Sequence, residues 1–267
     1  MSRIAGRMAA LSGAGRKALV PFVTVGDPSL ASIVPVMHAL VAAGADLLEL
    51  GVPFSDPMAD GPVIQRSSER ALARGVGTNE VLEAVREFRR ADAHTPVVLM
   101  GYLNPVEIRG ADAFALAASD AGVDGLLLVD LPPEEAAPFR ACFSAHGIDL
   151  ISLAAPTTSP ERLQRLAEES QGYLYYVSLA GVTGAALGDG GDIAGRTADL
   201  RARARVPLLI GFGIKDAQSA AAMGKLADGI VVGSALVSAL ADADSPDQAA
   251  QRAGAFLAPL RAALDAL

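Results

Sequence analysis

The sequence is poor in cysteine, histidine and aromatic residues. Its 267 residues include one Cys, three His and no Trp, and aromatic residues make up 4% of the chain. The single cysteine, Cys142, excludes a disulfide within the chain, which fits a reducing compartment. His38, His94 and His146 are scattered without the spacing of metal ligands, so we expect no metal site.

The chain also lacks a long apolar run and an excess of positive charge. No uninterrupted apolar stretch approaches the roughly 20 residues that span a bilayer. The first 17 residues carry basic side chains without the compact apolar core of a signal peptide, and their pattern predicts a short amphipathic helix. A formal net charge of −8 argues against nucleic acid or an anionic membrane as the main partner. We therefore expect a cytoplasmic protein.

Apolar, strand-like runs alternate with helical patterns from end to end. The predicted strands are residues 18–25, 46–50, 96–100, 125–130, 149–153, 173–178, 207–210 and 229–232. The predicted helices include residues 30–43, 79–90, 111–121, 133–146, 160–169, 192–203, 217–225 and a closing helix over 246–267. Eight such strand–helix units favour an α/β fold of the (β/α)8 TIM barrel type with an extra amino-terminal helix. A doubly wound open sheet is the alternative.

We see no linker or break in composition along the chain, so we predict one domain over residues 1–267. Gly, Pro, Asp and Asn follow the first five predicted strands, as in the segment after residue 50. Barrel enzymes build their active sites from the loops at the carboxyl ends of their strands. We therefore expect a site at that end of the barrel.

Glu49 is the first candidate catalytic residue. Strand alternation places Leu47 and Glu49 on one face and Leu48 and Leu50 on the other. Burial disfavours an unpaired carboxylate, and no Lys or Arg lies on a predicted strand to pair with it. An unpaired acid in apolar surroundings has a raised pKa, which suits a general acid–base.

Asp60 is the second candidate, and its spacing permits two interpretations. It lies in a loop rich in Pro and Gly after the strand that carries Glu49. Asp60-Gly61-Pro62 before a helical run is also a pattern typical of a helix N-cap with proline in the first turn. Spacing alone does not separate a catalytic acid from a cap.

Glycines at the ends of the last two strands predict a phosphate site. Gly211 and Gly213 follow the seventh predicted strand, and Gly233 and Ser234 follow the eighth. Glycine lets backbone N–H groups approach an anion, and loops after strands seven and eight of a barrel commonly hold phosphate. Helix caps also use glycine, which is the alternative.

The segment LELGVPFSDPMADG at residues 48–61, together with SLAGVTG at residues 178–184, resembles the tryptophan synthase alpha chain family. The resemblance extends over nearly the whole chain. It implies a lyase of tryptophan biosynthesis that cleaves indole-3-glycerol phosphate to indole and glyceraldehyde 3-phosphate without a cofactor. Glu49 and Asp60 match the two catalytic acids. The implied substrate contacts are Phe22, Tyr102, Leu127, Leu153, Tyr175, Thr183, Gly184, Phe212, Gly213, Gly233 and Ser234.

The resemblance also implies a partner, a pyridoxal-phosphate-dependent beta chain in an alpha2beta2 heterotetramer. The loop over residues 53–60 is the expected contact. Two departures, Leu179 and Ala180, stand where the family commonly has a polar or basic residue in a mobile loop. The alternatives are a free-standing indole-glycerol-phosphate lyase, a catalytically silent barrel that activates a beta chain, and another phosphate-binding barrel such as a sugar-phosphate isomerase.

Overall fold

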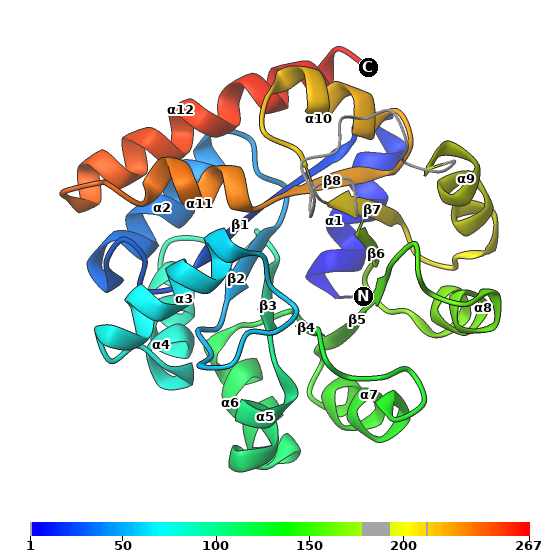
Figure 1. The fold of residues 1–267 in the computed structure, drawn as a ribbon, viewed down its shortest axis with the longest axis horizontal. Helices are drawn as coiled ribbons and strands as arrows, with labels where there is room; N and C mark the ends of the chain where they lie inside the picture. The colour runs from blue at the N-terminus through cyan, green and yellow to red at the C-terminus, as the bar shows by residue number, and fades with distance from the viewer. Residues whose placement is uncertain (1, 178–192, 212) are drawn as a thin grey trace.

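Eight parallel strands close into a barrel in chain order, with the last strand pairing back onto the first (Figure 1). The computed structural model describes residues 2–177, 193–211 and 213–267. The strands are β1 (Ala18–Thr24), β2 (Leu48–Gly51), β3 (Val97–Gly101), β4 (Gly125–Leu128), β5 (Asp149–Ala154), β6 (Leu174–Val177), β7 (Leu208–Gly211) and β8 (Gly229–Val232). The predicted closed barrel is therefore confirmed, and the open sheet is excluded.

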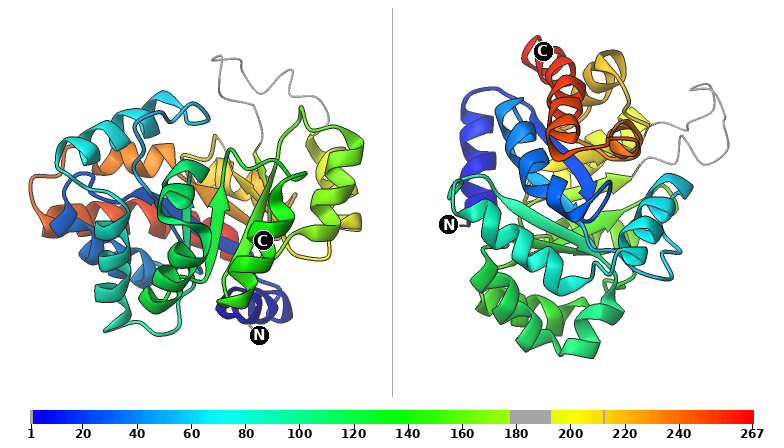
Figure 2. Two further views of the ribbon diagram at one scale, coloured as in Figure 1. Left: turned by 90° about the horizontal axis from the view of Figure 1, so that it is seen from below. Right: turned by 90° about the vertical axis from the view of Figure 1, so that its left-hand side faces the viewer.

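Helices surround the barrel and connect its strands (Figures 1 and 2). They are α1 (Arg3–Gly13), α2 (Leu30–Ala42), α3 (Pro62–Ala73), α4 (Thr78–Arg89), α5 (Leu103–Arg109), α6 (Ala111–Ala121), α7 (Ala136–Ala145), α8 (Pro160–Glu169), α9 (Ile193–Arg203), α10 (Ala217–Gly224), α11 (Ser234–Leu240) and α12 (Pro246–Asp265). Within the described ranges, no helix is long and apolar enough to cross a membrane.

The predicted strands match the observed ones closely and differ from them at their ends. The fourth strand ends at Leu128 instead of continuing to residue 130, because the chain turns there toward Pro132 and Pro133. Helices α5 and α11 were not predicted. Each has seven residues, which is too short for a hydrophobic period to be read from the sequence.

Two apolar layers lie on the two faces of the sheet. Side chains that point into the barrel form one cluster with helix α1, and outward-pointing side chains pack beneath the outer helices. Leu47 belongs to the interior cluster, whereas Leu48 and Leu50 belong to the outer one, as the alternation predicts. Glu49 is two residues after Leu47, so it lies on the interior face of β2, in register with Phe22 of β1.

The predicted amino-terminal helix, α1, closes one end of the barrel (Figure 2). Its buried residues Ile4, Met8 and Leu11 join the interior cluster. A Cβ on Gly125 would lie 2.9 Å from Cδ1 of Ile4, so the glycine at the start of β4 allows the helix to approach the strands. The barrel interior is thereby sealed at its amino-terminal end, and access is left at the carboxyl ends of the strands.

Three aspartates fasten neighbouring strands at this closed end. Each stands just before an even-numbered strand and accepts a hydrogen bond from a backbone N–H of the strand before it. The pairs are Asp46 with Leu19 at 2.9 Å, Asp124 with Val97 at 2.8 Å and Asp228 with Leu208 at 2.9 Å. Gln171 makes the same kind of bond to the N–H of Leu150 at 2.9 Å. Alternate strand pairs are therefore joined by side chains as well as by the sheet itself.

Candidate active site

Glu49 lies inside the barrel, where its carboxylate has few hydrogen-bond partners. The residue is 1% exposed, and one carboxylate oxygen accepts a hydrogen bond from the Tyr173 hydroxyl at 3.2 Å. The other oxygen is buried without a hydrogen-bond partner among the residues that the structure describes. Glu49 takes part in no ion pair with the residues that the structure describes.

Burial raises the pKa of Glu49 to about 7, and the hydrogen bond from Tyr173 offsets part of the rise. The protonated and ionised forms are then both populated near neutral pH. A group of this kind can give a proton at one step and take one at another. The expectation of an unpaired acid with a raised pKa is confirmed.

Asp60 lies in the loop between β2 and α3, partly exposed, and its carboxylate faces Tyr102. The Tyr102 hydroxyl donates a hydrogen bond to Asp60 Oδ2 at 3.0 Å. Burial raises the pKa of Asp60, and the hydrogen bond from Tyr102 opposes that rise. The N-cap of α3 is Gly61, without a side-chain cap bond, so the interpretation of Asp60 as a helix cap is wrong.

The helix after Asp60 is anchored to the loop after β1. Asp27, 4% exposed, accepts bonds from Ser67 at 2.8 Å and from two nitrogens of Arg70 at 2.8 and 2.7 Å. Gln65, on the same helix, donates to the backbone carbonyls of Pro57 and Asp60 at 3.2 and 2.9 Å. These bonds fix the end of the loop that carries Asp60 relative to the barrel.

A small concavity of about 10 Å³ lies between Asp60 and the ends of strands β1 to β3. Its lining residues are Phe22, Gly51, Val52, Asp60, Ile64, Ser68, Met100, Gly101, Tyr102 and Val129. Of the larger cavities of the described chain, one lies against helices α2 and α4 and one beside α1, while a third lies at the carboxyl ends of β4 and β5 and is lined by Val129 and Leu153. Neither Glu49 nor Asp60 lines any of the three. We place the candidate site at the small concavity because it adjoins Asp60 and the strand that carries Glu49.

Four of the predicted ring contacts lie within or beside the barrel interior. Leu127 and Tyr175 belong to the interior cluster, and Leu153 packs against it. Phe22, 5% exposed, lines the concavity and covers Gly51. A Cβ on Gly211 would lie 2.0 Å from the Tyr175 hydroxyl oxygen, so only glycine leaves room for that tyrosine.

The described part of the predicted phosphate cradle is open and rich in glycine. Gly213 has φ +72° with no atom within 4 Å of a Cβ built on it, and a Cβ built on Gly233 would lie 3.6 Å from Cβ and Cδ1 of Phe22. Ser234 is exposed at the first position of α11. Thr183, Gly184 and Phe212, with Leu179 and Ala180, lie outside the described residues.

Tyr173 and Met100 also belong to the site, and neither was selected in the sequence analysis. Tyr173 lies just before β6 and donates to Glu49, and Met100 of β3 lines the concavity. Both follow from strand alternation, since Tyr173 is two residues before Tyr175, and Met100 is two residues after the interior residue Val98. Alternation identifies the face of the strand, but it does not show which side chain touches the acid.

The tryptophan synthase alpha chain family matches residues 8–265 of this chain. The chain belongs to that family. It is 67% identical over 266 residues to the tryptophan synthase alpha chain of Xanthomonas oryzae pv. oryzae strain MAFF 311018, with 99% of each chain covered. It is 64% identical over 265 residues to that of Xanthomonas campestris pv. campestris strain B100, covering 99% of this chain and 97% of the relative.

Solved tryptophan synthase structures have the same fold. The alpha subunit of Legionella pneumophila str. Paris has a TM-score of 0.92 and 45% identity, with 100% of both chains covered. A chain of the aminoacrylate-bound tryptophan synthase of M. tuberculosis has a TM-score of 0.86 and 35% identity, covering 99% of this chain and all of the other. As a member of the tryptophan synthase alpha chain family, this chain is a lyase that cleaves indole-3-glycerol phosphate in tryptophan biosynthesis.

Proposed function

We propose that Glu49 is the general acid–base of the cleavage and that Asp60 stabilises the charge that forms on the indole ring. The observation that carries this proposal is the buried, unpaired carboxyl of Glu49, whose pKa lies at about 7. The bond to be broken joins C3 of indole to C3′ of the glycerol phosphate, so the reaction is a retro-aldol cleavage. Such a cleavage needs one proton delivered and one proton removed.

Glu49 performs both transfers. Its carboxyl group gives a proton to indole C3, which makes the ring a cationic indolenine. Its carboxylate then takes the proton of the C3′ hydroxyl. The oxygen's electron pair forms the aldehyde as the C3–C3′ pair returns to the ring. Indole and glyceraldehyde 3-phosphate leave, and Glu49 ends with the proton count it began with.

Asp60 stays ionised during this cycle. The indole N–H carries positive charge in the indolenine, and an anionic acceptor at that atom lowers the barrier. The Tyr102 hydroxyl donates to one carboxylate oxygen at 3.0 Å and so favours the ionised form. Two carboxylates in different surroundings then divide the work between proton transfer and charge stabilisation.

The remaining substrate contacts are assigned by chemistry. Phe22, Tyr102, Leu127, Leu153 and Tyr175, together with Phe212, provide apolar and aromatic surface for the flat ring. Gly213, Gly233 and Ser234, with Thr183 and Gly184, hold the phosphate through backbone N–H groups and hydroxyls. Replacing Gly233 by valine should raise KM for the phosphorylated substrate only. An equal loss with a substrate that lacks the phosphate would assign Gly233 to packing.

The assay of indole release from purified protein tests the proposal. Glu49→Gln and Asp60→Asn should each lower turnover by about 10²- to 10⁴-fold, the usual contribution of a positioned acid or base. Both variants should fold normally, as judged by circular dichroism. If Glu49→Gln kept activity within a few-fold of wild type, Glu49 would not be the general acid–base and the proposed mechanism would be wrong. The same assay excludes a silent barrel if wild-type protein releases indole.

We also propose a beta chain as partner, in an alpha2beta2 tetramer within the cytoplasm. Met58 in the loop before Asp60 and Ile108 on α5 are 82% and 79% exposed, and large apolar side chains left exposed favour an interaction surface. Docking there would favour the loop conformation in which Asp60 meets the substrate. An activation of roughly 5- to 150-fold corresponds to about 1–3 kcal/mol of coupling.

Titration of purified beta chain into the indole-release assay tests the partner. Wild-type activity should rise on addition, and Asp56→Ala, which changes an exposed loop residue, should weaken the rise. Full activity of the isolated chain with no binding to the beta chain would instead indicate a free-standing lyase.

A further inference from the structure

The hydroxyl of Tyr102 makes two hydrogen bonds, both to the loop that carries Asp60. It accepts from the backbone N–H of Ala59 at 3.0 Å and donates to Asp60 Oδ2 at 3.0 Å. The direction of the second bond follows from the first, because an amide N–H can only donate and the single phenol proton is then free for the carboxylate. Tyr102 is 4% exposed, so water competes little for these bonds.

The tyrosine is held in place by the rigid part of the barrel. It directly follows β3, and the backbone N–H of Leu103, the next residue, donates to Asp130 Oδ1 at 2.8 Å. Its ring stacks on Phe54 with centroids 4.9 Å apart and planes inclined by 27°. Tyr102 therefore connects a fixed strand end to both ends of the loop, at Phe54 and at Asp60.

We propose that Tyr102 is a positioning residue that holds Asp60 ionised and aims its free oxygen at the indole N–H. This proposal rests on the role assigned to Asp60 above. A hydroxyl donor to Oδ2 favours the carboxylate over the carboxyl form and leaves Oδ1 for the substrate. The backbone bond to Ala59 fixes the segment on which Asp60 stands.

The simpler alternative makes Tyr102 only an aromatic wall for the substrate ring. The two roles differ in their dependence on the hydroxyl. A wall needs the ring alone, and Tyr102→Phe keeps the ring and its stacking on Phe54. A positioning residue loses its function when the oxygen is removed.

The first experiment compares Tyr102→Phe with wild type in the indole-release assay across pH. We expect kcat to fall by about 10- to 100-fold, as for the loss of a hydrogen bond to a charged group, with KM little changed. The acid limb of the pH profile should move to higher pH, because Asp60 loses the donor that favours its charged form. Tyr102 is the titratable group in contact with Asp60, and the charge of Asp130 also acts on Tyr102.

A matched control is Tyr176→Phe. Tyr176 is 1% exposed, and its hydroxyl has no hydrogen-bond partner in the described part of the chain. It belongs to the cluster outside the barrel, so its change should leave kcat and the pH profile as in wild type. Thermal melts of both variants show whether a loss of activity is a loss of fold.

A double-mutant cycle with Asp60→Asn decides between the two roles. If Tyr102 acts through Asp60, adding Tyr102→Phe to Asp60→Asn should cost less than two-fold. A full further loss in the Asp60→Asn background would overturn the proposal, because the hydroxyl of Tyr102 would then act independently of Asp60. So would Tyr102→Phe activity within two-fold of wild type with an unmoved acid limb. If Asp60→Asn were itself fully active, the role of Asp60 would fail first, which is a separate result.

Discussion

Asp46 lies just before strand β2 and Glu49 lies on it, three residues later, and both are 1% exposed. Asp46, at the closed end of the barrel, accepts from the Leu19 N–H at 2.9 Å and pairs with Arg7 at 2.8 Å and Arg261 at 3.0 Å. Glu49, three residues further along the chain and inside the barrel, has a single hydrogen bond and no ion pair within the described chain. The two carboxylates are thus equally buried, but Asp46 has several polar partners and Glu49 has one.

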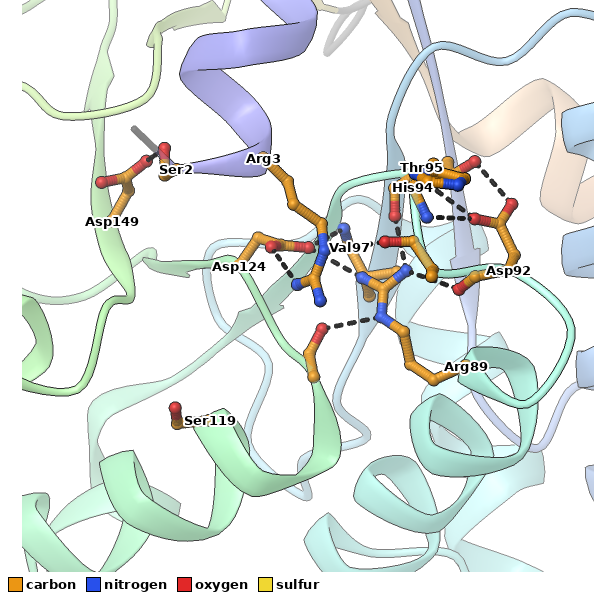
Figure 3. Close-up of polar contacts among 12 residues, drawn as sticks. Ser2, Arg3, Arg89, Asp92, His94, Thr95, Val97, Ser119, Asp124 and Asp149 are labelled. Carbon is orange, nitrogen blue, oxygen red and sulfur yellow. Dashed lines mark hydrogen bonds and ion pairs between the residues drawn. The ribbon is translucent and has the colours of Figure 1, made fainter.

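The same contrast extends to the two ends of the barrel. At the closed end, Asp124 lies between Arg3 and Arg89, each at 2.7 Å, and also accepts the Val97 N–H (Figure 3). At the open end, Asp60 has a tyrosine hydroxyl where Asp124 has two guanidinium groups. The closed end therefore satisfies its carboxylates for stability, whereas the open end leaves two carboxylates poorly satisfied. An acid that must exchange protons cannot also be locked in an ion pair.

The largest expected effect comes from comparing the loss of the carboxylate charge at Glu49 with the same loss at Asp46. Glu49→Gln should lower indole release by about 10²- to 10⁴-fold. Asp46→Asn should leave kcat within a few-fold of wild type in protein that is folded, because Asp46 contacts only the scaffold. Comparable losses of kcat in the two variants would dissolve the distinction between the ends of the barrel.

The second effect concerns stability at the closed end. Asp46→Ala leaves the 7%-exposed Arg261 without this carboxylate and the Leu19 N–H without its acceptor. Breaking a buried ion pair by removing one partner typically costs about 3–5 kcal/mol. Urea unfolding should show this loss, and Asp46→Asn, which keeps an acceptor oxygen, should lose less. The comparison breaks down if Asp46→Ala is as stable as wild type.

The third effect is a gain in stability from removing the carboxyl group of Glu49, the proposed catalytic acid. The pKa of Glu49 is about 7, against an ordinary value of 4.5, so folding favours its protonated form. This contribution is fully present below pH 4.5 and is lost as the pH rises through 7, which corresponds to about 3 kcal/mol. Glu49→Gln should therefore be more stable than wild type at pH 8, with the difference fading by pH 4. A difference independent of pH would contradict the burial of an unpaired acid.

The smallest effect tests how much exposure weakens an ion pair. Arg3 pairs with Asp124 from a side chain that is 41% exposed, whereas Arg89 does so from one that is 11% exposed. Arg3→Ala should cost no more than about 1 kcal/mol, because exposed pairs are screened and Arg89 remains. Urea unfolding measures this as well. If Arg3→Ala lost as much unfolding free energy as Asp46→Ala, the burial of an ion pair would not determine how much it stabilises the fold.

The fold could be predicted from the sequence because the strand and helix patterns alternate without interruption. The helical pattern of the first 17 residues likewise predicted α1, and alternation placed Glu49 inside the barrel. Helices α5 and α11 were not predicted, because a seven-residue helix is too short to show a helical repeat of apolar residues. The prediction of a single domain over residues 1–267 stays a prediction.

The site could be predicted only in part. Glu49 was identified because it is an unpaired acid on a strand, whereas Asp60 was selected over a helix cap only through the resemblance to the family. Tyr173, and the bond between Tyr102 and Asp60, could not be predicted, since they join residues 124 and 42 positions apart through geometry that spacing does not encode. For the same reason the spacing of Asp60 could not exclude a helix cap, which the position of Gly61 does.

The most direct test of the contrast is the titration of Glu49 itself. Carboxyl ¹³C resonances of glutamate-labelled protein, compared between wild type and Glu49→Gln, assign one signal to this side chain. We predict that this signal titrates with a pKa of about 7 in the folded protein. A pKa near the ordinary glutamate value would mean that the Glu49 carboxylate is stabilised by polar partners, as the acids at the closed end are, and would contradict the acid–base role proposed for it.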